Sequence, residues 1–219
     1  MTLTIDTLVL GPLETNCYVL REAGDCWVVD PGMDPGPLME FLARESAAVS
    51  RIVLTHGHGD HIAGAGEVKA AYSRALVTCP AGDAWMLTDP QGNLSAPFGF
   101  SVTCPPADEL IAPGQTLVMG QGPHSPAPGR SGWRVLDTSG HTPGGVSLHC
   151  PTAEVVLTGD ALFAGGIGRT DIPGGSASRL LRNIREQLLT LPDATGVLPG
   201  HGPATSVGRE RRTNPFFAQ

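Results

Sequence analysis

The chain has 219 residues, a formal net charge of −7 at pH 7 and 41% hydrophobic residues. This length and composition suffice for one well-buried core, so we expect a single domain over residues 1–219. The acidic balance, without a long basic run or an apolar stretch of about twenty residues, argues against a nucleic-acid partner and against a membrane segment.

The first part of the chain predicts a meander of strands followed by a helix. Its N-terminus lacks a basic segment followed by an apolar one, so we expect a cytoplasmic protein. Short β-prone runs predict strands over 3–10, 15–21 and 25–30. Asp30 ends the third run, either as a turn-forming residue or as an acceptor that orients a ligand histidine. Apolar residues on one face predict a helix over 36–47.

Four potential metal ligands follow the next predicted strand, 51–55. They are His56, His58, Asp60 and His61, and a helix is expected after them over 62–72. On an extended backbone, the side chains of two histidines that are two residues apart point to the same side and can bind one ion. The side chains of the adjacent Asp60 and His61 point in different directions, so they would not easily bind the same ion as the two histidines. A second ion beside the first would allow both to act as ligands. A polar turn formed by chance is the alternative, but three of the chain's seven histidines lie within these six residues.

The middle of the chain predicts a strand over 75–78 and a short helix over 81–87. Residues 89–106 are rich in Gly, Pro, Ser and Asn, which predicts an ordered loop. This loop either borders the active site or is a plain surface connection.

Two further strand-like runs, 117–119 and 133–137, flank a second loop over 120–132. His124 in this loop has no neighbouring ligand residue, and we expect it to be exposed to solvent. The five cysteines are odd in number and contain no CxxC pair, so we expect reduced, mostly buried thiols.

Three later strand ends each carry one polar residue beside glycine. The predicted strands 133–138, 155–158 and 196–199 precede His141, Asp160 and His201. Such ends can converge at one edge of a sheet. His149 instead lies within a predicted strand, 146–150, and is expected to be structural. The candidate metal ligands are therefore His56, His58, Asp60, His61, His141, Asp160 and His201.

Taken together, these residues resemble the metallo-β-lactamase fold superfamily, whose motif T-H-x-H-x-D-H matches Thr55 to His61. The resemblance implies an α/β (α+β) fold, a four-layer αββα sandwich with two metal ions at one edge. It implies one ion on His56, His58 and His141. The second ion would lie on Asp60, His61 and His201, and Asp160 would bridge the two.

Within the superfamily the chain is most similar to short, single-domain members of the glyoxalase II group, the hydroxyacylglutathione hydrolases. The motifs that carry this resemblance are Gly11-Pro-Leu-Glu-Thr-Asn-Cys-Tyr18, Asp30-Pro-Gly32, Gly140-His-Thr-Pro-Gly144, Gly168-Arg-Thr-Asp171 and Gly208-Arg-Glu-Arg-Arg-Thr-Asn-Pro-Phe216. Glyoxalase II proper continues into a helical segment that contributes to the glutathione site, whereas this chain ends at Gln219.

This resemblance implies hydrolysis of a thioester such as S-lactoylglutathione. Two divalent ions would share a water, lower its pKa and so generate a hydroxide nucleophile. Zinc is the first choice, and iron or manganese tolerate similar ligands. The centre would carry net positive charge and attract a small anionic thioester. A thiolate leaves without a strong general acid, and Asp60 is the candidate catalytic residue that could donate a proton.

Four arginines are candidate substrate contacts. Arg169 either anchors its loop or contacts a substrate carboxylate, whereas Arg209, Arg211 and Arg212 form either a solvated helix face or part of a thiol-recognition surface. The sequence makes no prediction of oligomeric state.

Two other activities and one non-catalytic role are alternatives to thioester hydrolysis. A persulfide dioxygenase of the same fold binds a single iron and also shows a Gly-Arg-Thr-Asp segment. Other hydrolases of this fold act on lactones, β-lactams or phosphodiesters. A binding module without catalysis would require a vestigial metal site, which the complete ligand set disfavours.

Overall fold

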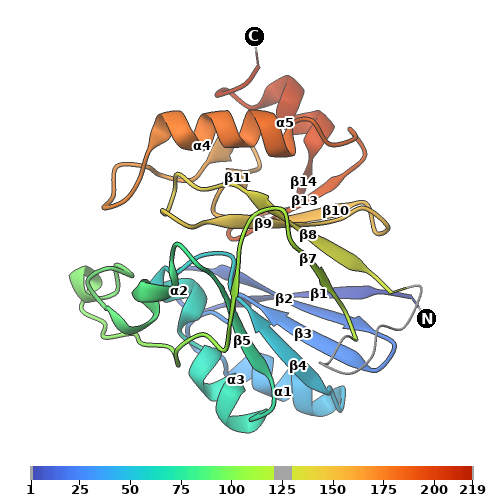
Figure 1. Cartoon of the computed structure of the whole chain (residues 1–219), viewed down its shortest axis with the longest axis vertical. Coiled ribbons are helices and arrows are strands. Elements are labelled where there is room, and N and C mark those ends of the chain that lie inside the picture. The colour runs from blue at the N-terminus through green and yellow to red at the C-terminus, as the bar shows by residue number, and fades with distance from the viewer. Residues whose placement is uncertain (1, 121–129, 219) are drawn as a thin grey trace.

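The computed structural model describes residues 2–120 and 130–218 and contains two mixed sheets that pack face to face, with helices on both outer faces (Figure 1). The first sheet has its strands in chain order: β1 (Thr4–Leu10), β2 (Thr15–Glu22), β3 (Asp25–Val29), β4 (Val49–Val53), β5 (Leu76–Pro80) and β6 (Glu109–Ile111). Strands β1 to β3 are antiparallel, and β3 to β6 are parallel.

The second sheet is ordered β14-β13-β10-β9-β8-β7. Its strands are β7 (Thr116–Val118), β8 (Gly132–Asp137), β9 (Val146–Cys150), β10 (Val155–Gly159), β13 (Gly196–Pro199) and β14 (Thr205–Ser206). A small hairpin of β11 (Leu162–Phe163) and β12 (Gly166–Ile167) stands beside it. Because β9 is antiparallel to both β8 and β10, and β10 is parallel to β13, strands β8, β10 and β13 all end at the same edge.

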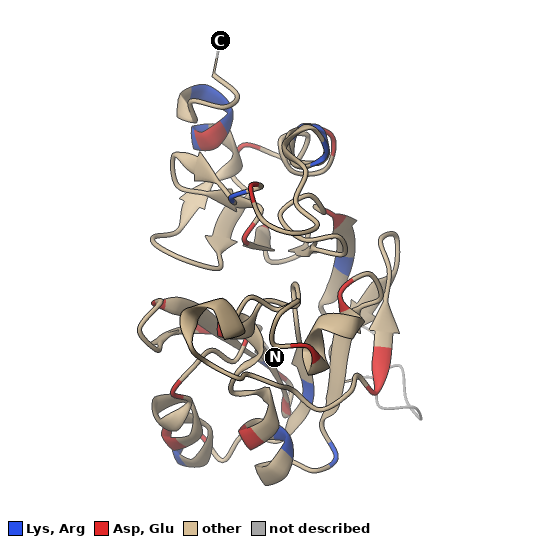
Figure 2. Ribbon diagram, turned by 90° about the vertical axis from the view of Figure 1, so that its left-hand side faces the viewer, with Lys and Arg blue, Asp and Glu red and all other residues tan. Residues whose placement is uncertain are grey.

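The helices are α1 (Gly36–Arg44), α2 (Gly59–Ile62), α3 (Ala65–Ala71), α4 (Ala177–Asn183) and α5 (Val207–Thr213), with 3₁₀ turns η1 (Ala84–Thr88) and η2 (Ala96–Phe98) and a π-helical turn η3 (Ile184–Leu188). Helices α1 and α3 cover the first sheet, and α4 and α5 cover the second (Figure 1). Figure 2 shows Lys and Arg mixed with Asp and Glu on these outer helices. In the described residues, no helix has the length and apolar character to cross a membrane.

Three apolar cores separate the four layers. Strand β2 shows why: its side chains alternate, so that Val19 packs toward the helices of the first sheet and Leu20 packs toward the second sheet. Both faces are covered, and every residue of β2 except Arg21 is buried. On the far side, Leu180 and Ile184 join the third core between the second sheet and its helices. The expected αββα sandwich is confirmed.

The long helix expected over 62–72 is wrong in its start and its continuity. Helix α2 already begins at Gly59, and the helical conformation is interrupted at Gly64, before α3 begins. The amide of Gly64 donates to the carbonyl of Pro31 at 2.8 Å, and a side chain there would meet the Gly32 carbonyl oxygen at 2.8 Å. The close approach of this neighbouring loop sets the break.

Other differences are smaller. The helix expected over 36–47 ends at Arg44, and the one expected over 81–87 is the 3₁₀ turn η1. Strand β6, the hairpin β11–β12 and the continuous turn of α4 and η3 were not predicted. All five cysteines are buried and free, as expected. Most of the loop expected over 120–132, including His124, lies outside the described residues.

Candidate metal centre

The seven candidate ligands meet where both sheets end. His56 and His58 follow β4 of the first sheet, and Asp60 and His61 lie in the short helix α2 that comes next. His141, Asp160 and His201 follow β8, β10 and β13 of the second sheet. The two sheets are joined here by main-chain contacts, since the amide of Asn16 donates to the carbonyl of Gly200 at 2.7 Å. Residues that are far apart in sequence therefore face one another across this edge.

The first group consists of His56, His58 and His141, whose ring nitrogens lie within 4.8 Å of one another. The His58 Nδ1 and His141 Nε2 atoms are only 2.9 Å apart. His56 Nε2 is buried and has no hydrogen-bond partner among the described residues. Three imidazole nitrogens that converge in this way form one face of a metal coordination sphere.

The second group consists of Asp60, His61 and His201. The Nε2 atoms of His61 and His201 are 3.2 Å apart, and Asp60 Oδ2 lies 3.2 Å from His201 Nε2 and 3.6 Å from His61 Nε2.

Asp160 lies between the two groups. Its Oδ2 is 3.5 Å from both His141 Nε2 and His201 Nε2, and its Oδ1 is 3.3 Å from His61 Nε2. Oδ1 is buried and has no hydrogen-bond partner among the described residues. A carboxylate in this position can reach an ion in either group.

The outer nitrogens of the histidines determine which atoms face the centre. His141 Nδ1 donates to the carbonyl of Arg169 at 2.8 Å, and His201 Nδ1 donates to the carbonyl of Leu13 at 2.9 Å. Carbonyl oxygens only accept, so both Nδ1 atoms carry a proton, and the neutral form of each ring would direct its Nε2 lone pair inward. His61 Nδ1 is held in the same way by Asp30 Oδ2 at 3.0 Å.

The donor set fits a bound cation. With their Nδ1 atoms protonated, neutral His61 and His201 would direct two lone pairs at each other across 3.2 Å, which a cation between them would satisfy. Burial lowers the pKa of His58 to about 3 and that of His56 well below its usual range, so both are neutral, the form that binds metal. Burial alone would lower the pKa of His61, but Asp160 and Asp60 outweigh it and raise that pKa. The two carboxylates thus favour a positive charge here, which a metal ion would supply in place of the ring proton.

A model of the Metallo-beta-lactamase superfamily matches residues 10–201. The chain belongs to the metallo-beta-lactamase superfamily. Its curated relatives include the probable metallo-hydrolase YqgX of Bacillus subtilis, 37% identical over 208 residues that cover 95% of this chain and 94% of YqgX. They also include the hydroxyacylglutathione hydrolase GloC of Haemophilus influenzae, 28% identical over 216 residues that cover 98% of each. The expectation of a metal-dependent hydrolase of this superfamily is confirmed.

Three solved structures superpose on nearly the whole chain. BLEG-1 B3 metallo-beta-lactamase has a TM-score of 0.90 at 36% identity, with 99% of this chain and 100% of that chain covered. TTHA1623 in a di-iron-bound form has a TM-score of 0.83 at 32% identity, with coverages of 96% and 99%. ETHE1 from Myxococcus xanthus has a TM-score of 0.79 at 26% identity, with coverages of 98% and 84%.

Asp83 is a residue beside this candidate metal centre that the sequence analysis missed. Its buried carboxylate accepts hydrogen bonds from the Gly57 amide at 3.1 Å, the Thr142 hydroxyl at 2.6 Å and the Gly144 amide at 2.6 Å. It thus joins the turn between His56 and His58 to the loop that carries His141. An aspartate within an expected helix gave no signal of this role.

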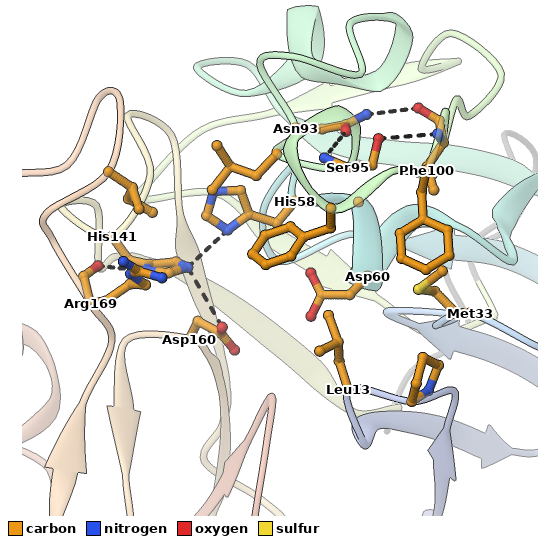
Figure 3. A pocket seen from close by; sticks show the side chains of 16 residues that line it. Leu13, Met33, His58, Asp60, Asn93, Ser95, Phe100, His141, Asp160 and Arg169 are labelled. Carbon is orange, nitrogen blue, oxygen red and sulfur yellow. Dashed lines mark hydrogen bonds and ion pairs between the residues drawn. The ribbon is translucent and has the colours of Figure 1, made fainter.

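A pocket of about 340 Å³ opens in front of the centre, and His58, Asp60, His141 and Asp160 line it (Figure 3). The segment expected as a loop over 89–106 borders the site, because it supplies Asn93, Leu94, Ser95, Phe98, Phe100 and Val102 to the pocket. This decides between the two roles that the sequence left open for the segment.

The candidate substrate arginines separate into two places. Arg169 lines the pocket, where its guanidinium pairs with both oxygens of Asp171 at 2.9 and 3.1 Å. Arg211 and Arg212 pair with Asp193 on the outer helix layer, and Arg209 is exposed on α5. Of the four, Arg169 alone is among the described residues that line the pocket.

Proposed function

We propose that this protein is a dinuclear metal-dependent hydrolase that cleaves thioesters. The observation that carries the proposal is the position of Asp160 between two groups of imidazole and carboxylate ligands, within 3.5 Å of His141 and His201. The GloC relative, a hydroxyacylglutathione hydrolase by name, supports the thioester class. The di-iron form of TTHA1623 supports the dinuclear centre, in which zinc remains our first choice and iron is the alternative.

His56, His58 and His141 would hold one ion, Asp60, His61 and His201 the other, and Asp160 both. When bound, two divalent ions supply a Lewis acid for the substrate carbonyl and lower the pKa of water toward neutrality. In the overall reaction, the water oxygen forms a bond to the carbonyl carbon, the C–S bond breaks, and its electron pair leaves with the sulfur.

Asp60 is the proposed group for proton transfer because it belongs to the centre and also lines the pocket. Burial acts to raise the pKa of its carboxyl, but His61 and His201 outweigh burial and lower that pKa, so the carboxylate form is available to accept a proton. Thr15 Oγ1 donates to Asp60 Oδ2 at 3.4 Å and helps to orient it. The proton can then pass to the departing sulfur.

The remaining polar side chains of the described pocket wall favour a leaving group that needs little acid assistance. Asn93 donates its amide protons to the carbonyls of Met86 and Val102, and Ser95 Oγ accepts from the Val102 amide. These groups hold the loop together and leave no strong acid over the centre. A thiol with a pKa near about 8.5 departs readily in such a site, whereas an amine or alkoxide usually requires a proton.

A persulfide dioxygenase is the second candidate, favoured by the structural similarity to ETHE1. It would use one iron on the first histidine group and consume oxygen. Lactone and other ester hydrolases would use the same centre as the thioesterase.

Metal content and turnover measured on one sample test the proposal. We expect two metal ions per chain by elemental analysis, together with saturable thiol release from a thioester panel that includes S-lactoylglutathione. One iron per chain, no thiol release and oxygen uptake with glutathione persulfide would instead establish the dioxygenase.

A further inference from the structure

Much of the pocket wall beside the metal ligands is apolar. It is built from the loop after β1, the loop after β3, the segment around η2 and the loop before α4, as Figure 3 shows for the labelled residues. Six of its apolar side chains are Leu13, Met33, Leu94, Phe98, Phe100 and Ile172. Because His58 and Asp60 line the same cavity, a substrate whose reacting carbonyl lies at the centre must place an adjoining group against this wall.

Large apolar side chains are left exposed around this cavity. Phe98 is 64% exposed, Leu13 50% and Phe100 44%. Single exposed apolar residues are ordinary, but a group of them around one concave site marks a surface that binds an apolar ligand. The described chain itself places nothing over them.

The same wall offers little to hold charge. Among the described residues that line the pocket, Arg169 is the only lysine or arginine, and Asp171 already binds the Nε and Nη2 edge of its guanidinium. Asn93 and Ser95 already bond to main-chain groups of η1 and of their own loop. Glutathione carries two carboxylates and an ammonium group, and the wall offers its carboxylates one cation, which is already paired with Asp171. An uncharged substrate group would give up only its contacts with water on binding to this wall.

We propose that the substrate presents an uncharged aliphatic or aromatic group to this wall, and that the protein therefore prefers thioesters with an apolar group over S-lactoylglutathione. The inference rests on the proposed thioester hydrolysis. The apolar group is either the acyl chain or the thiol carrier, since each adjoins the carbonyl carbon that reacts.

Two series of thioesters, assayed with the metal-loaded enzyme, show whether the acyl chain or the thiol carrier contacts the wall. The first lengthens the acyl chain from acetyl to hexanoyl on N-acetylcysteamine, and the second lengthens the alkanethiol of an acetyl thioester from ethyl to hexyl. In the series whose group contacts the wall, kcat/KM should rise by up to about fourfold per methylene, which corresponds to about 0.8 kcal/mol for each buried CH₂. Its best member should exceed S-lactoylglutathione by at least about tenfold. Two flat series, or a clear preference for S-lactoylglutathione, would overturn the proposal and leave thioester hydrolysis standing.

Measurements of ligand binding test the role of the apolar wall without relying on catalysis. We expect the non-hydrolysable thioether S-hexyl-N-acetylcysteamine to bind at least about tenfold more tightly than its S-ethyl analogue by calorimetry. Tight binding without hydrolysis of any thioester would refute the proposed function but support the apolar specificity. Equal binding of the two thioethers would refute the specificity.

Phe98→Ala should reduce the dependence on chain length severalfold in both assays. Leu110→Ala is the matched control, because Leu110 is 54% exposed on strand β6 and does not line the pocket. It should leave the chain-length dependence unchanged. If Phe98→Ala alters the oligomeric state measured by light scattering but not the chain-length dependence, the exposed side chains form a protein contact and the proposal is wrong.

Discussion

Asp30 accepts a hydrogen bond from His61, with 3.0 Å between Oδ2 and Nδ1. The same carboxylate accepts from the amide and the hydroxyl of Thr55 at 2.8 and 2.6 Å. Asp30 is buried and has a positive φ of 51°, so it both turns the chain and orients a candidate ligand. The two roles that the sequence offered as alternatives for this residue occur together.

Replacement of Asp30 by Asn should weaken the binding of the second metal ion. The amide would keep one oxygen for Thr55 but would turn an NH₂ group toward the protonated Nδ1 of His61, and the ring would lose its preferred orientation. We expect metal affinity to fall about 10- to 100-fold in competition titrations with a chelator. Asp34→Asn is the control, since Asp34 has nearly the same φ of 52° but is exposed. Equal affinities for both variants would show that Asp30 acts only as a turn residue.

Asp83→Asn should destabilise the fold at the junction of the two ligand loops. The carboxylate accepts from three donors through both oxygens, and an amide in its place must leave at least one buried donor without an acceptor. The expected loss is about 1 to 3 kcal/mol in the free energy of unfolding, measured by urea titration. Asp89→Asn should change stability by less than about 0.5 kcal/mol, because the single acceptor used by Gln91 is retained. A loss at Asp83 no larger than this control would contradict the role assigned to it.

Local pattern explains which parts of this fold were predictable. Strands β2 to β4 are short β-prone runs, and the ligands lie in the segments that follow strand ends, so both could be predicted from neighbouring residues. The junction at Asp83 and the apolar wall around Phe98 depend on contacts between segments far apart in sequence, and no local pattern marks them. The helical turn α4–η3 did carry a signal that was overlooked, because Leu180, Ile184 and Leu188 are spaced four residues apart and Ser176 caps the first turn.

The pair formed by Arg169 and Asp171 should anchor a loop rather than bind substrate. Both side chains are largely exposed, and the contribution of Arg169 to the centre runs through its carbonyl, which holds His141. Arg169→Gln and Asp171→Asn should therefore change KM equally and only slightly. A large rise in KM for anionic thioesters in Arg169→Gln alone would instead establish a contact between its guanidinium and a substrate carboxylate.

The buried thiols should be unreactive in the native protein. Burial raises the pKa of both Cys26 and Cys104 to about 12, and burial together with Asp30 raises that of Cys17 well above its usual range. A raised thiol pKa leaves almost no thiolate at pH 8, and the thiolate is the reactive form. We expect no thiols to react with Ellman's reagent before unfolding and all five to react in guanidinium chloride. A thiol that reacts at once in the native state would show that the site around it opens.

His201→Ala should remove one metal ion and leave the other. His201 belongs only to the second group, whereas His56, His58 and His141 keep their convergent nitrogens in this variant. Elemental analysis should therefore give about one ion per chain instead of two, and thioester turnover should fall by at least about 100-fold because the paired ions act together. His149→Gln is the control: His149 lies buried in β9 outside both groups, and two ions should remain. Loss of both ions in His201→Ala, with the fold retained by circular dichroism, would mean that the two groups bind metal as one cooperative unit. Retention of two ions would remove His201 from the ligand set.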